Sequence, residues 1–175
     1  MLEVDGRVLS QSTAMLAFIA PMGGLLPRDP WQAAKVWEWV GGVEDMVKQL
    51  IPVHRERDAE LRKAALARAA AEIFPFFLAR FADLFESNGG GQWCVGGSCT
   101  VADLVLYVRL SYYFKRTGAY ANVTDRAGAP EGMLEAYPSL ARHNARVAAL
   151  DKVAEWEARG ELLKPRTSSR RGAKF

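Results

Sequence analysis

Apolar residues recur at helical spacing along most of this chain of 175 residues. Between residues 31 and 50 they form one stripe, made of Val36, Val40, Val43, Val47 and Leu50. The stretch 57–85 repeats the spacing, and stripes of this kind are buried on one face of a helix. Pro75 lies inside the second stretch and predicts a kink or break, because it lacks an N–H and clashes with the preceding turn. The chain is therefore predicted to be mainly α, with a helical bundle over residues 31–160.

A strong helix-start signal follows the glycine-rich stretch 88–97. Thr100 can accept a hydrogen bond from the backbone N–H of Asp103, while the Asp103 carboxylate reaches back to the Thr100 N–H. This pattern is a capping box with a shorter acid than usual. It predicts a helix that begins at Thr100, runs to about Tyr113 and buries Leu104, Tyr107 and Val108.

The first 24 residues carry a different pattern. Residues 2–9 are typical of two short strands joined by a tight turn, and Gln11-Ser12 precedes the apolar run 14–20, which predicts a helix. Two interpretations of this pair are open. Ser12 can be an ordinary N-cap with Gln11 in solvent, or the Ser12 N–H and hydroxyl can hold a small carboxylate at the positive end of the helix.

The formal net charge of +3 comes from the end of the chain. Residues 164–175 contain five basic residues and no acid, so the remainder has a net charge of −2. Their Ser, Gly and Arg content predicts a basic disordered tail over 161–175. This distribution gives no support to nucleic-acid binding by the folded part.

The composition also argues against a membrane-spanning, secreted or metal-binding protein. No run of 18 apolar residues is present to span a membrane, and the N-terminus lacks the pattern of a signal peptide, so we expect a cytoplasmic protein that is not bound to membranes. Cys94 and Cys99 are the only cysteines; a disulfide is one alternative, but an isolated pair favours reduced, inert thiols. His54 and His143 show no ligand spacing, so no metal is assigned.

Several of these segments together resemble a known family. The run from Leu2 through Gln11-Ser12 to Ala20, the phrase Gly96 to Asp103, and Tyr137-Pro138-Ser139-Leu140 are similar to glutathione S-transferases, most like the sigma class. The resemblance covers residues 1–160. It implies a truncated thioredoxin-like remnant over 1–24, a linker over 25–30, the family's C-terminal helical domain over 31–160 and the tail beyond it.

The resemblance also implies a ligand and residues that bind it. The co-substrate would be glutathione, with Gln11 and Ser12 holding its γ-glutamyl carboxylate. Asp45 would reach across a homodimer to the ammonium group of glutathione in the partner subunit. A small-molecule electrophile would lie in an apolar pocket near Met46, Leu50 and Val105.

The resemblance carries over no catalytic residue. In the family, the catalytic Tyr lies at the end of a first strand that precedes the matched part, and the five tyrosines of this chain belong to the helical part. We therefore expect a fragment of a glutathione transferase, whose parent reaction is conjugation or isomerisation with the glutathione thiolate, and little or no activity in this chain. One alternative is a non-catalytic helical module that binds other proteins. Another is a helical domain in which both motifs are only structural.

Overall fold

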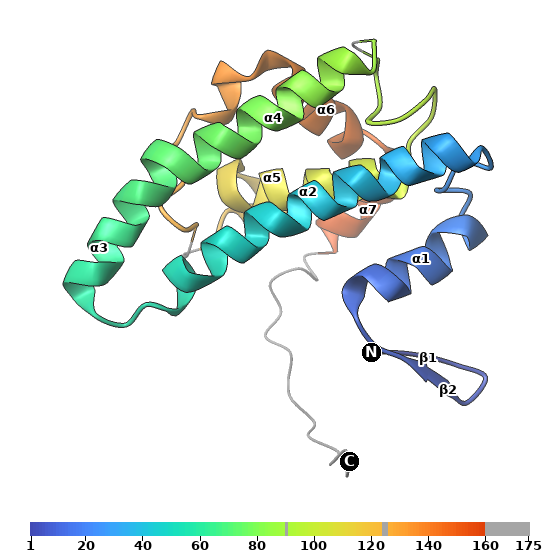
Figure 1. The fold of residues 1–175 in the computed structure, drawn as a ribbon, viewed down its shortest axis with the longest axis horizontal. Coiled ribbons are helices and arrows are strands. Elements are labelled where there is room, and N and C mark those ends of the chain that lie inside the picture. The colour runs from blue at the N-terminus through green and yellow to red at the C-terminus, as the bar shows by residue number, and fades with distance from the viewer. Residues whose placement is uncertain (90, 124–125, 160–175) are drawn as a thin grey trace.

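The computed structural model describes residues 1–89, 91–123 and 126–159, so the tail predicted over 161–175 lies outside the described residues. Within these ranges the secondary structure is almost entirely helical, apart from two short strands near the N-terminus (Figure 1). The predicted mainly α-helical bundle preceded by a hairpin is confirmed. None of the described helices has both the length and the apolar character needed to cross a membrane.

The hairpin consists of β1 (Leu2–Val4) and β2 (Arg7–Leu9), which pair in antiparallel fashion. Its register places Leu2 opposite Leu9, Glu3 opposite Val8 and Val4 opposite Arg7. The turn residues Asp5 and Gly6 both have positive φ, at 51° and 73°. Positive φ at both central positions is the signature of a type I′ turn, whose twist matches that of the paired strands.

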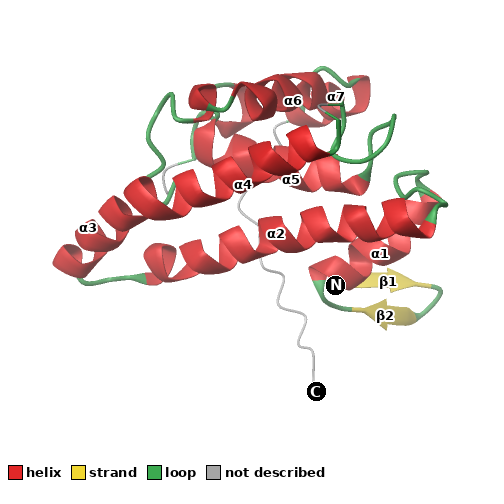
Figure 2. Ribbon diagram, turned by 45° about the horizontal axis from the view of Figure 1, so that its top comes forward, coloured by secondary structure: helices red, strands yellow, loops and turns green. Residues whose placement is uncertain are grey.

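The first helix, α1 (Ser12–Met22), connects the hairpin to the bundle. Figure 2 shows the two strands on the outer side of α1, away from the long helices. Ala20 is fully buried in the bundle core, whereas Phe18, Ile19 and Met22 are exposed. The apolar surface of α1 is thus only partly covered.

The longest helix, α2, runs from Pro30 to Arg55 and is longer than predicted. Asp29 caps its start, because its carboxylate accepts a hydrogen bond of 2.8 Å from the Gln32 N–H, and Pro30 occupies the first turn, where no N–H is needed. Its buried stripe includes Val36, Val40, Val43 and Leu50, as the helical spacing predicted, whereas Val47 of the same predicted stripe is only half-buried.

The predicted interruption at Pro75 takes the form of a π-helical turn. Helix α3 (Ala59–Arg68) passes into the π-helix η1 (Ala69–Ile73) and then into α4 (Phe74–Ser87) without a loop. The Phe74 N–H bonds to the carbonyl of Ala69, five residues back. A π turn widens the backbone locally, so the chain accommodates the missing N–H and the ring of proline while remaining helical.

The C-terminal half adds three helices, namely α5 (Val101–Phe114), α6 (Pro138–Ala148) and α7 (Asp151–Ala158). Two short 3-10 turns, η2 (Gly118–Tyr120) and η3 (Leu134–Ala136), lie between α5 and α6. Helix α5 packs against both α2 and α6 and so forms the centre of the bundle. Tyr107 is buried as predicted, but Leu104 and Val108 are only half-buried; the core face of α5 instead carries Leu106, Leu110 and Tyr113.

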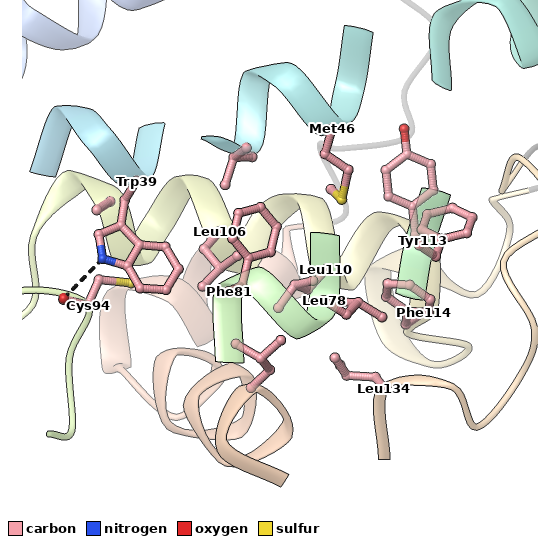
Figure 3. Packing of buried hydrophobic residues seen from close by; sticks show 14 of the residues in the cluster. Trp39, Met46, Leu78, Phe81, Cys94, Leu106, Leu110, Tyr113, Phe114 and Leu134 are labelled. Carbon is pink, nitrogen blue, oxygen red and sulfur yellow. Dashed lines mark hydrogen bonds between the residues drawn. The ribbon is translucent and has the colours of Figure 1, made fainter. Parts of the chain in front are cut away.

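Aromatic side chains fill the core between α2, α4 and α5. The Trp39 ring stacks on Phe81 with 5.8 Å between centroids and meets the edge of Phe85 at 5.3 Å. The Trp39 indole N–H also donates a hydrogen bond of 3.1 Å to the Cys94 carbonyl, which ties the glycine-rich loop to the core (Figure 3). These residues are almost completely buried, and the burial of such large apolar side chains contributes to the stability of the bundle.

Two adjacent glycines of α2 should respond differently to alanine. A Cβ added at Gly41 meets no atom within 4 Å, whereas one at Gly42 lies 3.3 Å from Cε1 of the buried Phe81 ring. Glycine inside a helix costs roughly 0.5–1 kcal/mol relative to alanine. We expect Gly41→Ala to raise the free energy of unfolding by about that amount and Gly42→Ala to give no gain, as measured by urea denaturation. Equal gains would show that Phe81 does not limit the approach of α4 to α2.

Candidate functional site

The start of α1 has an unusual backbone and no side-chain cap. Gln11 is the residue before the first helical residue, Ser12, and has φ 73° and ψ 123°. A non-glycine residue in this region is strained by about 1–3 kcal/mol, and such strain is concentrated at ligand-binding sites. Ser12 itself is helical and makes no capping hydrogen bond, so the interpretation of Ser12 as an ordinary N-cap is wrong. The first N–H groups of α1 receive no side-chain cap.

This helix start lines a cavity of about 380 Å³ between α1 and α2. Gln11, Ser12 and Thr13 form one side of the cavity. The other side belongs to α2 and consists of Trp37, Val40, Gly41, Glu44 and Lys48. The cavity therefore combines a helix N-terminus, which favours an anion, with one acidic and one basic side chain.

Asp45, the acid that the resemblance assigned to glutathione, does not line this cavity. Its side chain is 65% exposed and accepts a hydrogen bond of 2.9 Å from Lys48 Nζ. That hydrogen bond, together with the charge of Asp45, raises the pKa of Lys48. Lys48 does line the cavity, so Asp45 influences the cavity only through its hydrogen bond to Lys48.

Two of the three residues expected around an electrophile are in the core. Met46 and Leu50 are fully buried, and Figure 3 shows the Met46 side chain directed from α2 into the apolar cluster. The helical stripe to which they belong faces α5 instead of solvent, which corrects their assignment to a pocket. Val105 is half-buried and packs against the same core.

A larger apolar cavity, of about 740 Å³, lies elsewhere, between α5 and α7. Its lining includes Leu25, Cys99, Leu104, Tyr107, Val108 and Trp156. The sequence did not reveal it, because the apolar residues of α5 occupy two faces of the helix and spacing alone does not show which face meets the core.

The predicted capping box is present at the start of α5 and is completely buried. Asp103 Oδ2 accepts hydrogen bonds of 2.7 Å from both the N–H and the hydroxyl of Thr100. Asp103 Oδ1 accepts a further bond of 2.7 Å from the Cys94 N–H and lies 2.9 Å from His143 Nε2. One carboxylate thus joins the glycine-rich loop, α5 and α6.

These contacts also determine the charge of Asp103. Burial alone would raise the pKa of this carboxyl. The hydrogen bonds from His143, from the N–H groups of Cys94 and Thr100 and from the Thr100 hydroxyl outweigh burial and hold the pKa below its ordinary value. Asp103 is therefore an ionised carboxylate inside the bundle, and His143 Nε2 is the donor of the bond that they share.

Cys94, Asp103 and His143 together offer three atoms of metal-ligand type within 4.8 Å of one another. The sequence did not predict this grouping, since Asp103 and His143 are 40 residues apart. The carboxylate oxygens of Asp103 already accept four hydrogen bonds in the cap, and these account for the close approach of the three side chains without an ion. Both cysteines are free, and burial raises the pKa of the Cys94 thiol, which keeps it protonated and inert.

No tyrosine among the described residues lines the cavity at Ser12. Tyr107 donates to Glu157, and burial raises its pKa and lifts that of Tyr120 to about 12. A hydroxyl with a raised pKa is poorly suited to stabilising a thiolate at neutral pH. The Tyr137 hydroxyl donates to the Pro75 carbonyl at 3.3 Å, which ties the junction between η3 and α6 to α4.

Comparison with known proteins agrees with this architecture. The family model for the C-terminal domain of glutathione S-transferase matches residues 44–160, which is more than half of the chain. The chain therefore belongs to the glutathione S-transferase family. It is 28% identical over 156 residues to glutathione S-transferase S1 of Drosophila melanogaster and 31% identical over 113 residues to glutathione S-transferase 1 of Ascaris suum.

These relatives are longer proteins. The matches cover 89% of this chain and 57% of the Drosophila protein, and 61% of this chain and 52% of the Ascaris protein. Among solved structures, prostaglandin synthase D of Nilaparvata lugens superimposes with a TM-score of 0.71 at 21% identity, covering 88% of this chain and 70% of that one. The rat hPGDS structure gives 0.69 at 19% identity, with coverage of 94% and 72%. At these identities the structures support the fold alone.

The buried carboxylate gives a prediction for stability. Asp103→Asn removes the charge while keeping the shape, and leaves donors of Thr100, Cys94 or His143 without a full partner. We expect the free energy of unfolding at pH 7 to fall by about 2–4 kcal/mol, more than the roughly 1 kcal/mol of an exposed cap. Asp83→Asn, at an exposed position of α4, is the matched control and should change little.

The same residue should contribute to the dependence of stability on pH. A carboxyl whose pKa is lower in the folded protein stabilises it above the unfolded pKa of about 4, and this contribution is lost as pH falls through the folded pKa. Urea denaturation between about pH 2 and 7 should show a steeper loss of stability in acid for the native protein than for Asp103→Asn. Parallel curves would contradict an ionised Asp103.

Proposed function

We propose that this chain binds the γ-glutamyl part of glutathione at the start of α1. Ser12 would hold the carboxylate through its N–H and hydroxyl, and the Gln11 side chain would bind beside it. The observation that carries the proposal is the uncapped, strained start of α1, which faces a cavity instead of a capping side chain. Membership of the glutathione S-transferase family supports glutathione as the ligand.

The parent activity that we propose is transfer of the glutathione thiolate to an electrophilic small molecule, or an isomerisation that uses the same thiol. The family name and those of the curated relatives support this class of reaction. Thiolate chemistry requires a group that lowers the pKa of the thiol. The described tyrosines lie away from the cavity at Ser12, so we propose that this chain binds glutathione but catalyses little transfer.

A specific observation favours a second function, as a module that binds another protein or a second copy of the chain. Phe18 and Met22, which lie one helical turn apart on α1, are both exposed. Contiguous exposed apolar surface marks interaction sites, whereas single exposed apolar residues are common on any protein surface. A homodimer, as the resemblance implies, would be seen as a doubled mass by light scattering after size-exclusion chromatography.

Substitution of Ser12 tests the proposed site. Ser12→Ala removes the hydroxyl donor while keeping the helix, and a hydrogen bond to a charged group contributes about 1.5–3 kcal/mol. We expect the Kd for glutathione, measured by NMR titration, to rise roughly tenfold. Ser10→Ala, an exposed change just before the cavity, should leave the Kd unchanged. Equal affinity of the Ser12→Ala and native proteins would contradict the assignment.

A further inference from the structure

We propose that the segment of chain directly after α7 folds back over the apolar cavity between α5 and α7, with Leu162 and Leu163 as its anchors. The cavity is then an internal docking surface for the start of the C-terminal tail. This inference is independent of glutathione binding, because the cavity at Ser12 lies between α1 and α2 and has different walls.

Water reaches the apolar wall of this cavity, whose volume is about 740 Å³. Six apolar side chains that line it are each only half-buried, namely Leu25, Leu104, Val108, Leu150, Val153 and Trp156. Contiguous apolar surface that is left in water marks an interaction site. Covering it would also stabilise the protein, because apolar area is removed from water.

The polar groups of the wall offer little to a polar ligand. The Tyr107 hydroxyl donates to Glu157, and the Cys99 thiol donates to the Thr100 carbonyl at 3.7 Å. Burial raises the pKa of the Cys99 thiol to about 11, so the thiol stays protonated. The occupant of the cavity must therefore be mainly apolar.

The chain itself brings two leucines to this place. Helix α7 forms one wall of the cavity and ends at Ala158, four residues before Leu162 and five before Leu163. Val153 lies five residues before Ala158, about 7.5 Å along the helix, whereas four extended residues span about 13 Å. Gly160 occupies the position after the C-cap, where glycine commonly ends a helix in a left-handed conformation that lets the chain turn. Leu162 and Leu163 can therefore reach back to the wall.

Charge also favours this occupant. Helix α7 carries three acidic residues and one lysine, whereas residues 164–175 carry five basic residues and no acid. Asp151 lines the cavity and forms no ion pair with any residue that the structure describes, while its neighbour Lys152 is bound to Glu155 at 3.0 Å. A segment that runs back along α7 brings Lys164 past Val153 to Asp151, so the two leucines enter the cavity with a cation beside its free acid.

A tethered segment has an advantage over a separate molecule. A link of only a few residues keeps the effective concentration of the leucines on the order of millimolar. The ordering cost is confined to those few residues. The start of the tail therefore occupies the cavity in preference to a second copy of the chain.

Nuclear Overhauser effects test this contact in the intact chain. We expect cross-peaks from the methyl groups of Leu162 and Leu163 to the cavity wall, at the Trp156 ring and the Val153 methyls. In the variant Leu162→Ser/Leu163→Ser, a soluble paramagnetic agent should broaden the wall signals that are protected in the native chain. Phe175→Ser removes an apolar side chain from the same tail and is the matched control, which should keep the native cross-peaks and protection.

A second variant tests the ionic contact and leaves both leucines in place. Lys164→Glu puts an acid next to Asp151, and two like charges in contact repel each other. We expect the cross-peaks between the leucines and the wall to weaken and the Asp151 amide signal to shift. Lys174→Glu makes the same change of charge further along the tail and should leave both unchanged. Equal effects of the two variants would overturn the placement of Lys164 at Asp151.

The remaining outcomes overturn the proposal or decide between variants. Absence of cross-peaks between the two leucines and the wall in the native chain overturns it. In a mixture of isotope-labelled and unlabelled chains, cross-peaks between the two kinds of chain place a second copy in the cavity and also overturn it. Amide spectra of all variants should overlay with the native spectrum outside the linker, α5 and α7, and a global change in the leucine variant leaves Lys164→Glu and the native cross-peaks to decide. Glutathione is absent throughout, so failure here leaves the proposed function standing.

Discussion

The Asp103 carboxylate is the interaction on which the bundle depends. It is fully buried and ionised, and it accepts hydrogen bonds from Thr100 at the start of α5, from the Cys94 N–H in the glycine-rich loop and from His143 on α6. An unpaired charge in this position would cost several kcal/mol. The bundle is therefore stable only when α5, the glycine-rich loop and α6 all pack against this carboxylate. The cap thus fixes the relative positions of distant segments as well as the start of α5.

The candidate site is connected to this centre through the linker. The Val101 N–H, in the first turn of α5, donates a hydrogen bond of 2.9 Å to the Leu25 carbonyl, and the Leu25 N–H donates one of 2.8 Å to the Ala20 carbonyl at the end of α1. Ala20 is itself in the core. The position of α1 against α2, and thus the shape of the cavity at Ser12, follows from the same packing that surrounds Asp103.

Sequence signals found the elements more readily than the contacts between them. The hairpin, the start of α1 and the capping box were predictable because each depends on residues that are close together in the sequence. The bond between Asp103 and His143 joins positions 40 apart and leaves no local signal. The pocket that the resemblance implied at Met46 and Leu50 is also not found, because an apolar stripe shows that a face is covered but not whether a ligand or another helix covers it.

The two neighbouring acids of α2 show that the direction of a side chain, and not only the type of residue, decides which cavity it lines. A motif places Glu44 and Asp45 together, but a helix separates their side chains by about 100°, and only the position of α1 decides which of them shares a cavity with Ser12. That position depends in turn on Gln11, whose strained φ of 73° turns the chain from β2 into α1 while its carbonyl accepts the first helical bond, 3.0 Å from the Met15 N–H. Relaxing Gln11 would reorient the first turn of α1 relative to α2. The strain at one residue is thus the condition for a helix N-terminus and an acid to face each other across one cavity.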